Sequence, residues 1–390
     1  MERQQVLPDR PASAHLTSLS LRNFRNYEEC RVRIDAANVL LLGENGAGKT
    51  NLMEAVSLLA PGRGLRRARA EHLPRQDSDS DHWAVSADLW SGGELVRIGT
   101  GVLAGGDGVR RVMRRDGQTV AQTEIGRLVS VSWLTPRMDG IFIDSPGARR
   151  RFLDRLVIAF DAAHIGRTNR YEKLLRERAA LLAEGRSDEA WFGAIESSLA
   201  EAAIAVTAAR QALMADLNAE AADGWFDFPG VRLALDGLVE DWLAEGSALQ
   251  AEDRYVSLAR QRRQAGDQTL VGPHVSDMSA VNSHTGAPAH LASTGQQKAL
   301  LVAVVLAHAR LQARRLGRPP LLLLDDVVAH LDVARRGALF EAVGAVGAQA
   351  WFSGTDQNDF AGLDAQPLPI SAHDGMASIN SVGGMSDDRQ

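Results

Sequence analysis

Residues 43–50 carry the strongest chemical pattern in the chain, a glycine-rich loop that ends in lysine and threonine. The letters GENGAGKT fit the pattern G-x-x-x-x-G-K-[ST], with a short apolar run before it and a helix-compatible segment after it. Glycines let successive backbone N–H groups face one anion, and the following helix adds the partial positive charge of its N-terminus. The pattern predicts a binding site for the phosphates of a nucleotide, made of Gly43, Glu44, Asn45, Gly46, Ala47, Gly48, Lys49, Thr50 and Asn51.

Two side chains of this loop have separate predicted roles. We expect Lys49 to reach the β- and γ-phosphates and to act in catalysis, and Thr50 to place its hydroxyl on Mg²⁺. The chain contains only three lysines, Lys49, Lys173 and Lys298, among its 43 basic residues. A lysine kept where arginine is otherwise used indicates a site that needs a compact ammonium group. The alternative is a glycine-rich turn that holds a lysine by chance.

An apolar run that closes on two carboxylates follows much later in the chain. Residues 320–326 read PLLLLDD, which predicts a buried strand with Asp325 at its C-terminal edge, where ligands of parallel sheets bind. We expect Asp325 to hold Mg²⁺ and Asp326 to orient or deprotonate the attacking water. Asp332 is predicted to cap the next helix, and His330 is interpreted as a surface or interface imidazole. The alternative is a strand that ends in a solvated acidic turn.

A second helix N-terminus follows residue 292. Ser293, Thr294 and Gly295 precede an apolar helix predicted over about residues 296–311. Cap residues ahead of a buried helix make another anion site. An ordinary capped helix has the same pattern, so the functional interpretation depends on the presence of the phosphate loop.

Strands are predicted on both sides of a helical region. We expect an early strand within residues 16–27 and a buried strand at 39–42. Residues 82–120 alternate and contain Asp116-Gly117, which predicts antiparallel strands with a tight hairpin. Two further strands are predicted at 321–325 and near 350–353.

Helical spacing dominates the middle of the chain. Apolar residues step by threes and fours over 153–160 and 191–217, and no glycine or proline occurs from 194 to 223. A helix of that length reaches about 45 Å, so it either forms an arm or lies in a core. The chain therefore divides into a β-rich part, a helical part and an α/β part.

Composition limits the class of protein. The 390 residues are 45% hydrophobic and 24% charged, typical of a globular chain of two or three domains. No uninterrupted apolar run approaches the roughly 20 residues of a membrane span, and we identify no secretory signal. Cys30, the single cysteine, excludes an internal disulfide, so we expect a cytoplasmic protein. The net charge of −6 indicates that any nucleic-acid binding is local.

The order of the motifs resembles that of known ATPases. GENGAGKT, STGQQK and LLLLDDVVAHLD occur in the order of the Walker A motif, the signature motif and the Walker B motif with D-loop of ABC-type ATPases, a group that includes the SMC proteins. Five blocks more closely resemble the RecF family of bacterial recombination and gap-repair proteins: LRNFRNYEE at 21–29, PGRGLRRAR at 61–69, RRRFLDR at 149–155, GPHVSD at 272–277 and STGQQKALL at 293–301. The resemblance covers nearly the whole chain.

This resemblance implies a fold and a domain division. The implied fold class is α/β, a P-loop NTPase head of the ABC type with a mixed β-sheet, plus a helical second lobe that bears a short arm. We expect an ATP-binding lobe over 15–133 plus 318–380, a helical lobe over 134–317, and flexible tails at 1–14 and 381–390.

The resemblance also implies an ATP-gated homodimer. Signature residues of one copy, Ser293, Thr294, Gly295, Gln296 and Lys298, would contact the γ-phosphate held by the phosphate loop of the other copy, with Asp332 in the D-loop. Asp326 stands where many relatives have glutamate, so we expect slow, DNA-dependent ATP hydrolysis. Ser132 and Thr355 stand near the positions of the usual Q-loop glutamine and switch histidine, which leaves those sensing roles in doubt.

RecF-type function implies a clamp on DNA at single-strand gaps that helps RecO and RecR load RecA. Double- and single-stranded DNA are then the expected ligands, and no membrane partner is expected. Candidate DNA contacts are Arg66, Arg67, Arg110, Arg111, Arg149 and Arg150, each in an arginine cluster that is otherwise a solvated face. His274 and Asp277 match a family block without an assigned role. Asp77, Asp79, Asp81 and Asp88 echo a calcium loop, but His82 stands at the required glycine, so we predict a polar loop.

Two other functions remain open from the sequence. An ABC transporter's nucleotide-binding subunit would require a membrane-coupling partner and would ignore DNA. A structural DNA-binding protein that does not depend on nucleotide would keep its DNA affinity after Lys49→Ala.

Overall fold

The computed structural model describes residues 14–78, 80–103, 110–185, 188–329 and 331–379. The predictions for His330 and Asp79 fall outside these residues. The chain divides into two compact units, the first made of Met1–Asp139, Trp225–Phe228 and Val305–Gln390, the second of Gly140–Gly224 and Pro229–Val304. The lobes expected from the resemblance, divided at 133/134 and 317/318, stay a prediction.

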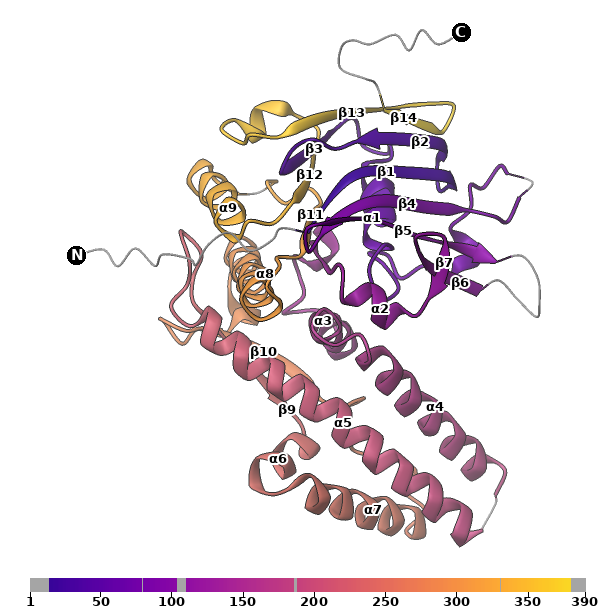
Figure 1. Cartoon of the computed structure of the whole chain (residues 1–390). Coiled ribbons are helices and arrows are strands. Elements are labelled where there is room, and N and C mark those ends of the chain that lie inside the picture. The colour runs from indigo at the N-terminus through magenta and orange to yellow at the C-terminus, as the bar shows by residue number, and fades with distance from the viewer. Residues whose placement is uncertain (1–13, 79, 104–109, 186–187, 330, 380–390) are drawn as a thin grey trace, which may run out of the picture. The chain divides into compact units, whose positions relative to one another are not determined.

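Unit 1 contains an antiparallel sheet of six strands in the order β2-β1-β4-β5-β6-β7 (Figure 1). The strands are β1 His15–Phe24, β2 Tyr27–Arg33, β4 Ala84–Ser91, β5 Glu94–Leu103, β6 Arg110–Arg115 and β7 Gln118–Val120. The expected early strand ends at Phe24 instead of Tyr27, because Arg25 takes a positive φ of 56° and the chain turns back to pair Tyr27 with Phe24. Asp116 and Gly117 also have positive φ, 48° and 83°, which confirms the predicted hairpin.

A second, mixed sheet of unit 1 has the order β14-β13-β3-β12-β11-β8. Its strands are β3 Asn38–Leu42, β8 Val131–Leu134, β11 Leu321–Leu324, β12 Ala350–Gly354, β13 Gln366–His373 and β14 Met376–Ile379. All neighbours are parallel except β13 and β14. The four leucines of β11 are buried, as expected of a central strand. Because β3 and β11 are parallel, the loops after them meet at one edge of the sheet.

Short helices complete unit 1. They are α1 Lys49–Ser57, η1 Ala70–His72, α2 Gln122–Gly126, η2 Pro136–Met138, α9 Val333–Val346 and η4 Gln357–Phe360. Residues of α1 such as Leu52, Met53 and Val56 are fully buried and pack into the same core as the inner faces of the sheets. The N-terminus of α1, which follows the phosphate loop, is therefore held in place by the packing of the rest of the helix.

Unit 2 is mainly helical. It contains α3 Pro146–Ile158, α4 His164–Ala183, α5 Glu189–Ala221, α6 Leu238–Glu245, α7 Ala248–Gln264 and η3 Ala289–Leu291, with two antiparallel strands, β9 Val231–Asp236 and β10 Asp277–Asn282. Helix α8 Thr294–Leu316 begins in unit 2 and ends in unit 1. Helices α4, α5 and α7 pack around one apolar cluster and form the short arm (Figure 1).

Helix α5 is the long helix predicted from the sequence. Asp188 caps it by accepting hydrogen bonds from the backbone N–H groups of Ala190 (3.0 Å) and Trp191 (3.2 Å). By length and composition alone, α5 could cross a membrane, although the sequence contains no uninterrupted apolar run of that length. More than half (56%) of its most apolar window is buried in the protein, as in the core helix of a helical domain.

Candidate nucleotide-binding site

The phosphate loop connects β3 to α1, as the sequence predicts. A Cβ atom on Gly43 would lie 2.2 Å from the carbonyl oxygen of Ile370, so only glycine fits beside β13. Gly48 has a φ of 117°, a conformation that side chains other than glycine rarely adopt. The glycines therefore set a loop path that turns directly into the N-terminus of α1, the arrangement that binds phosphate groups.

The side chain of Lys49 lies folded back over this loop. Its Nζ donates hydrogen bonds to the carbonyl oxygens of Gly43 (2.6 Å) and Glu44 (2.9 Å), and the residue is 5% exposed. Burial lowers the pKa of Lys49, and the nearby carboxylates of Asp326 and Asp325 oppose that shift. An ammonium group that carbonyl oxygens hold inside a phosphate loop is positioned to bind phosphate oxygens.

Thr50 and Asp325 meet across the mixed sheet. The Thr50 hydroxyl donates to the Asp325 carboxylate, at 3.2 Å from Oδ1 and 3.0 Å from Oδ2. Asp325 is 5% exposed, and its burial raises its pKa, although hydrogen bonds from Ser353 and Thr50 act in the opposite direction. A hydroxyl and a buried carboxylate in contact form the oxygen donor set that Mg²⁺ prefers. The two predicted metal ligands, 275 residues apart, are thus brought together.

Asp326 follows directly and is held by its backbone. Its φ is 47°, and its N–H donates to the hydroxyl of Ser353 (2.9 Å). Ser353 also donates to Asp325 Oδ1 at 2.7 Å, so one serine connects both carboxyl residues. Asp326 lies close enough to the phosphate loop for its charge to raise the pKa of Lys49.

Sequence reasoning missed Ser353. The motif comparison drew attention to Thr355, which is exposed, while Ser353, at the end of the buried strand β12, makes the contacts. Ser132, the other residue singled out, is buried and hydrogen bonds to His308 Nδ1 (3.2 Å) and accepts from Gln312 (3.3 Å). A polar residue inside an otherwise apolar central strand was the signal that could have identified Ser353.

A buried carboxylate supports the loop from behind. Glu54 of α1, 1% exposed, accepts two hydrogen bonds from Arg25, both of 2.8 Å, and one from Arg66 at 3.3 Å. Asn51 accepts a hydrogen bond from Arg66 and donates one to Asn26 (2.7 Å). Arg66 therefore supports α1, but it remains exposed, so its predicted contact with DNA stays a prediction.

The predicted signature residues start α8 in unit 2. Ser293 Oγ accepts from the N–H of Gln296 (3.4 Å), and Gln296 Oε1 accepts from the N–H of Ser293 (3.0 Å), a reciprocal cap. Ser293, Thr294 and Gln296 are exposed and Gly295 is half-buried. Lys298, by contrast, is 3% exposed, so it does not share their surface. The other helix cap predicted, Asp332, is confirmed, since it accepts from the N–H of Arg335 (2.8 Å).

Three further arginines predicted to contact DNA are engaged inside the protein. Arg111 donates to the carbonyl oxygens of Gly62 and Leu58, both at 2.5 Å, and burial lowers its pKa to about 10. Arg149 makes a double ion pair with Asp277, both distances 2.7 Å, and Arg150 donates to the carbonyl of Ser276 (2.8 Å). These three side chains hold neighbouring segments of the chain in place, because each binds a backbone carbonyl oxygen or a carboxylate. Arg66, Arg67 and Arg110 are exposed.

The GPHVSD block, which had no predicted role, joins several helices of unit 2. Arg149 of α3 holds Asp277, Arg210 of α5 donates to the carbonyl of Pro273 (2.6 Å), and Tyr171 of α4 hydrogen bonds to His274 Nδ1 (2.7 Å). Burial, together with the charge of Arg150, lowers the pKa of His274 to about 4, so the imidazole is neutral near pH 7. The block is a structural junction that leads into β10.

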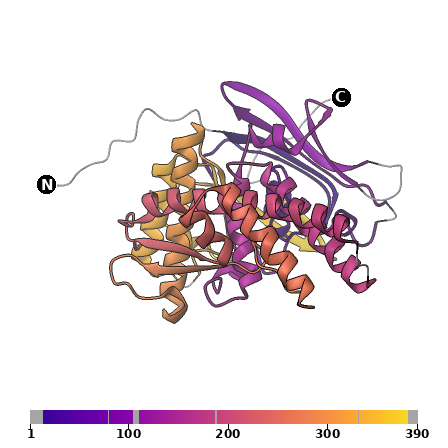
Figure 2. The same cartoon turned by 90° about the horizontal axis from the view of Figure 1, so that it is seen from below.

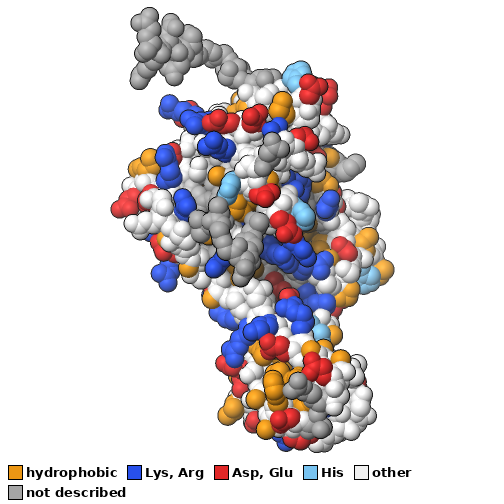
Figure 3. All heavy atoms as spheres, turned by 90° about the vertical axis from the view of Figure 1, so that its right-hand side faces the viewer, with side chains coloured by type: hydrophobic (Ala, Val, Ile, Leu, Met, Phe, Trp, Pro, Cys, Tyr) orange, Lys and Arg blue, Asp and Glu red, His pale blue; other side chains and the backbone are white. Residues whose placement is uncertain are grey.

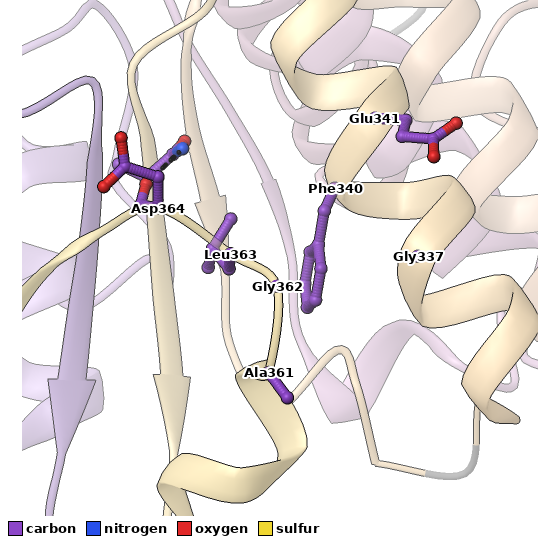
Figure 4. A pocket seen from close by; sticks show the side chains of 8 residues that line it. Gly337, Phe340, Glu341, Ala361, Gly362, Leu363 and Asp364 are labelled. Carbon is purple, nitrogen blue, oxygen red and sulfur yellow. Dashed lines mark hydrogen bonds between the residues drawn. The ribbon is translucent and has the colours of Figure 1, made fainter.

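A shallow pocket of about 340 Å³ lies elsewhere in unit 1 (Figure 4). Phe340 and Glu341 of α9 and residues 361–364 line it, and Phe340 points toward that segment. Asn38, at the start of β3, also lines it, whereas the phosphate loop follows the end of that strand. The pocket is therefore separate from the nucleotide site.

Other predicted features stay without a ligand role. Among the residues that the structure describes, no three His, Cys, Asp or Glu side chains gather as a metal site. Asp88, from the apparent calcium loop, instead pairs with Arg97 at 2.8 Å. On the face drawn in Figure 3, basic side chains gather in clusters separated by acidic ones, which fits the expectation of local basic surfaces.

The chain matches known proteins over most of its length. Residues 15–361 match the family model of the RecF/RecN/SMC N terminal domain. The chain is 43% identical over 360 residues to the DNA replication and repair protein RecF of Mesorhizobium japonicum, covering 90% of this chain and 94% of that protein. It is 41% identical over 384 residues to the protein of the same name from Brucella suis, covering 95% and 98%.

Solved structures share the fold. The recombination mediator protein RecF-ATPrS in the RecFOR pathway aligns with a TM-score of 0.81 at 21% identity, covering 96% of this chain and 100% of that one. An SMC head bound to the C-winged helix domain of ScpA aligns with a TM-score of 0.53 at 14% identity, covering 94% and 98%. The expected fold class, an ABC-type ATPase head, is confirmed.

Proposed function

We propose, from the premise that this chain belongs to the RecF family, that it is an ATP-binding protein of DNA replication and repair whose ATP-bound form is a homodimer on DNA. The contact of Thr50 with buried Asp325, beside Lys49 in the phosphate loop, carries this proposal. Its relatives' name supports the repair role, and a cytoplasmic place of action accords with it.

The residues present fit ATP with Mg²⁺. Thr50 Oγ1 and the Asp325 carboxylate would hold the ion, and bound Mg²⁺ supplies charge neutralisation for the phosphates. Lys49 would exchange its two neutral carbonyl partners for charged phosphate oxygens, which bind a buried ammonium group more strongly. The N–H groups at the start of α1 would bind the remaining phosphate oxygens.

Asp326 is the proposed base for hydrolysis. Its shorter side chain, compared with glutamate, keeps the carboxylate farther from a water aligned with the γ-phosphate, so we infer slow turnover that DNA accelerates. The exposed Ser293, Thr294, Gly295 and Gln296 would complete the site of a second copy. Lys298, because it is buried, is not included in this composite site.

The proposed place of action is the single-strand gap. A solved relative is named a recombination mediator in the RecFOR pathway, which supports partners of the RecO and RecR type and an indirect effect on RecA loading. Hydrolysis would remove the γ-phosphate that joins the two copies, and the dimer would then release DNA.

Mixing two inactive variants tests the composite site. Lys49→Ala disables the phosphate loop and Ser293→Arg blocks the signature surface, so each variant alone should form no ATP-dependent dimer. In an equimolar mixture, one of the two composite sites contains an intact loop and an intact signature, and partial dimerisation and ATPase activity should return. Analytical ultracentrifugation and phosphate release measure the two effects.

Ser247→Arg is the matched control for Ser293→Arg. Ser247 caps α7 through the same reciprocal arrangement with Gln250. The control substitution should therefore destabilise its helix by a similar amount without touching the proposed site. The control should dimerise normally with ATP. No recovery in the mixture of correctly folded variants would contradict the composite site.

A further inference from the structure

The antiparallel sheet of unit 1 has one buried and one exposed face. Leu21 of β1, Val85 of β4 and Ile98 of β5 are at most 1% exposed and point into the core. Alternate residues of each strand must then point outward. Figure 2 shows the curved strands of this sheet, with no helix of unit 1 covering this side of them. We call this exposed side the outer face.

Strand pairing places six arginines on the outer face. They are Arg31 and Arg33 of β2, Arg22 of β1, Arg97 of β5, and Arg110 and Arg114 of β6. Two carboxylates of the strands share the face, Glu29 and Asp88. The described strands therefore give the outer face an excess of four positive charges, while the chain as a whole carries −6. The positive face is a local feature and does not follow from the composition.

Three of these six arginine side chains form no ion pair with other described residues. Arg97 pairs with Asp88 (2.8 Å), Arg31 with Glu29 (3.1 Å) and Arg33 with Asp35 (2.9 Å). Arg22, Arg110 and Arg114 are exposed, and their side chains make no ion pair or hydrogen bond with other described residues. Even the paired arginines lie at the surface, where such pairs contribute little free energy and exchange readily for another anion.

The middle of the outer face is smooth. One row of paired residues runs Arg31, Ser20, Ser86, Gly99, Arg114 across five strands. Four strand spacings separate the two arginines by about 19 Å along the sheet, close to the width of a B-form duplex. Between them stand only hydroxymethyl groups and a glycine, so a phosphate backbone can approach the strands and accept hydrogen bonds from serine.

We propose that the outer face binds the phosphate backbone of double-stranded DNA, as the duplex-holding surface of the DNA-binding function proposed above. Arginine guanidinium groups bind phosphate in bidentate geometry. The large apolar side chains exposed here, Trp90 and Leu95, are confined to the β4–β5 end of the face. A surface that binds another protein would instead have an apolar centre. Charge and shape together favour the duplex.

A charge-reversal pair tests the proposal. In Arg22→Glu/Arg114→Glu, two unpaired arginines become glutamates on exposed strand positions, so the fold and its melting temperature should persist. Binding to a duplex with a single-strand gap is measured with ATP over a range of salt concentrations. Affinity at about 0.1 M salt should fall roughly 10- to 100-fold, and the slope of log affinity against log salt should decrease by about 2.

Arg176→Glu/Arg254→Glu is the matched control, because it makes the same change of net charge on exposed helices of the arm. The control should keep the slope of the unmodified protein, and both double variants should keep ATP-dependent dimerisation. Equal affinity and slope in the outer-face variant, or an equal loss in the control, overturns the outer-face proposal alone. Failure of the unmodified protein to bind gapped DNA with ATP contradicts the proposed function as well.

Discussion

At the scale of single residues, the nucleotide site is a set of charges held by neutral partners. Lys49 depends on two backbone carbonyls, and Asp325 on the hydroxyls of Thr50 and Ser353. Neutral partners satisfy hydrogen bonds but do not cancel charge, so a buried ammonium and a buried carboxylate each retain affinity for an opposite charge. The phosphates of ATP would bind the ammonium group, and Mg²⁺ would bind the carboxylate.

Ser353 is expected to set the position of both acidic residues. Ser353→Ala removes the donor to Asp325 (2.7 Å) and the acceptor for the N–H of Asp326. Losing such an outer contact typically lowers metal affinity or activity by 10- to 100-fold, so we expect a loss of about that size in Mg²⁺-dependent ATP hydrolysis. Thr355→Ala, two residues on and exposed, is the control and should change little. Equal effects of the two substitutions would show that Ser353 has no special role.

Stability should respond to pH through Asp325. Burial raises the pKa of this carboxyl group above its usual value, so the folded protein binds the proton more tightly than the unfolded chain. The free energy of unfolding without nucleotide therefore falls as the pH rises and this carboxyl group loses its proton. Asp325→Asn removes that contribution. The melting temperature of Asp325→Asn relative to the unmodified protein should rise as the pH is raised above the usual titration range of an aspartate carboxyl group. Added MgATP should stabilise only the unmodified protein, and a constant difference across pH would refute the assignment.

At the scale of elements, polar groups inside the arm join its helices. Arg178 of α4 and Glu196 of α5 form an ion pair at 3.1 Å with side chains 2% and 0% exposed, and Arg263 of α7 reaches the same carboxylate at 3.1 Å. A buried pair adds little stability compared with apolar residues, but removing one partner leaves a buried charge. The pair therefore fixes how the three helices align.

Glu196→Ala should destabilise the arm. It leaves Arg178 buried without its carboxylate, which typically costs about 3–5 kcal/mol. Urea unfolding followed by circular dichroism measures this cost. Glu177→Ala is the control, because Glu177 pairs with Lys173 at the surface and should change the free energy of unfolding by less than about 0.5 kcal/mol. A small effect of Glu196→Ala would mean that water reaches Arg178.

At the scale of the whole molecule, two exposed apolar residues flank the proposed dimer contacts. Leu291, just before the signature residues, is 75% exposed, and Val333, just after Asp332, is 83% exposed. Exposed aliphatic residues at these places are expected where a second copy covers them. Their burial would add apolar contact to the γ-phosphate interaction when ATP is bound.

Val333→Asp and Leu291→Asp should therefore weaken the ATP-dependent dimer while leaving the monomer stable. Fully burying such a side chain contributes about 1.5–3 kcal/mol, so each variant should require roughly 10- to 100-fold more protein to dimerise with ATP. Leu249→Asp, at an equally exposed position of α7 (68%), is the control and should dimerise normally. Sedimentation with ATP and with ADP measures the effect, and normal dimers in all three variants would exclude these residues from the interface.

The sequence alone determined the parts of the site that depend on local conformation. The phosphate loop, the strand that ends in Asp325 and the Asp116-Gly117 hairpin could be predicted because glycine positions and short-range periodicity restrict the backbone within a few residues. The meeting of Thr50 with Asp325 was also predictable, since parallel strands place their C-terminal ends together.

Tertiary structure alone decided which polar residues act in the site and which hold the fold. Ser353 contacts Asp325 from a neighbouring strand, while Arg111 reaches Gly62 and Arg149 reaches Asp277 over long stretches of chain. An arginine in a cluster has the same sequence pattern whether it faces solvent or a buried carbonyl. Its surroundings depend on packing between segments distant in the sequence, and no short-range pattern records that packing.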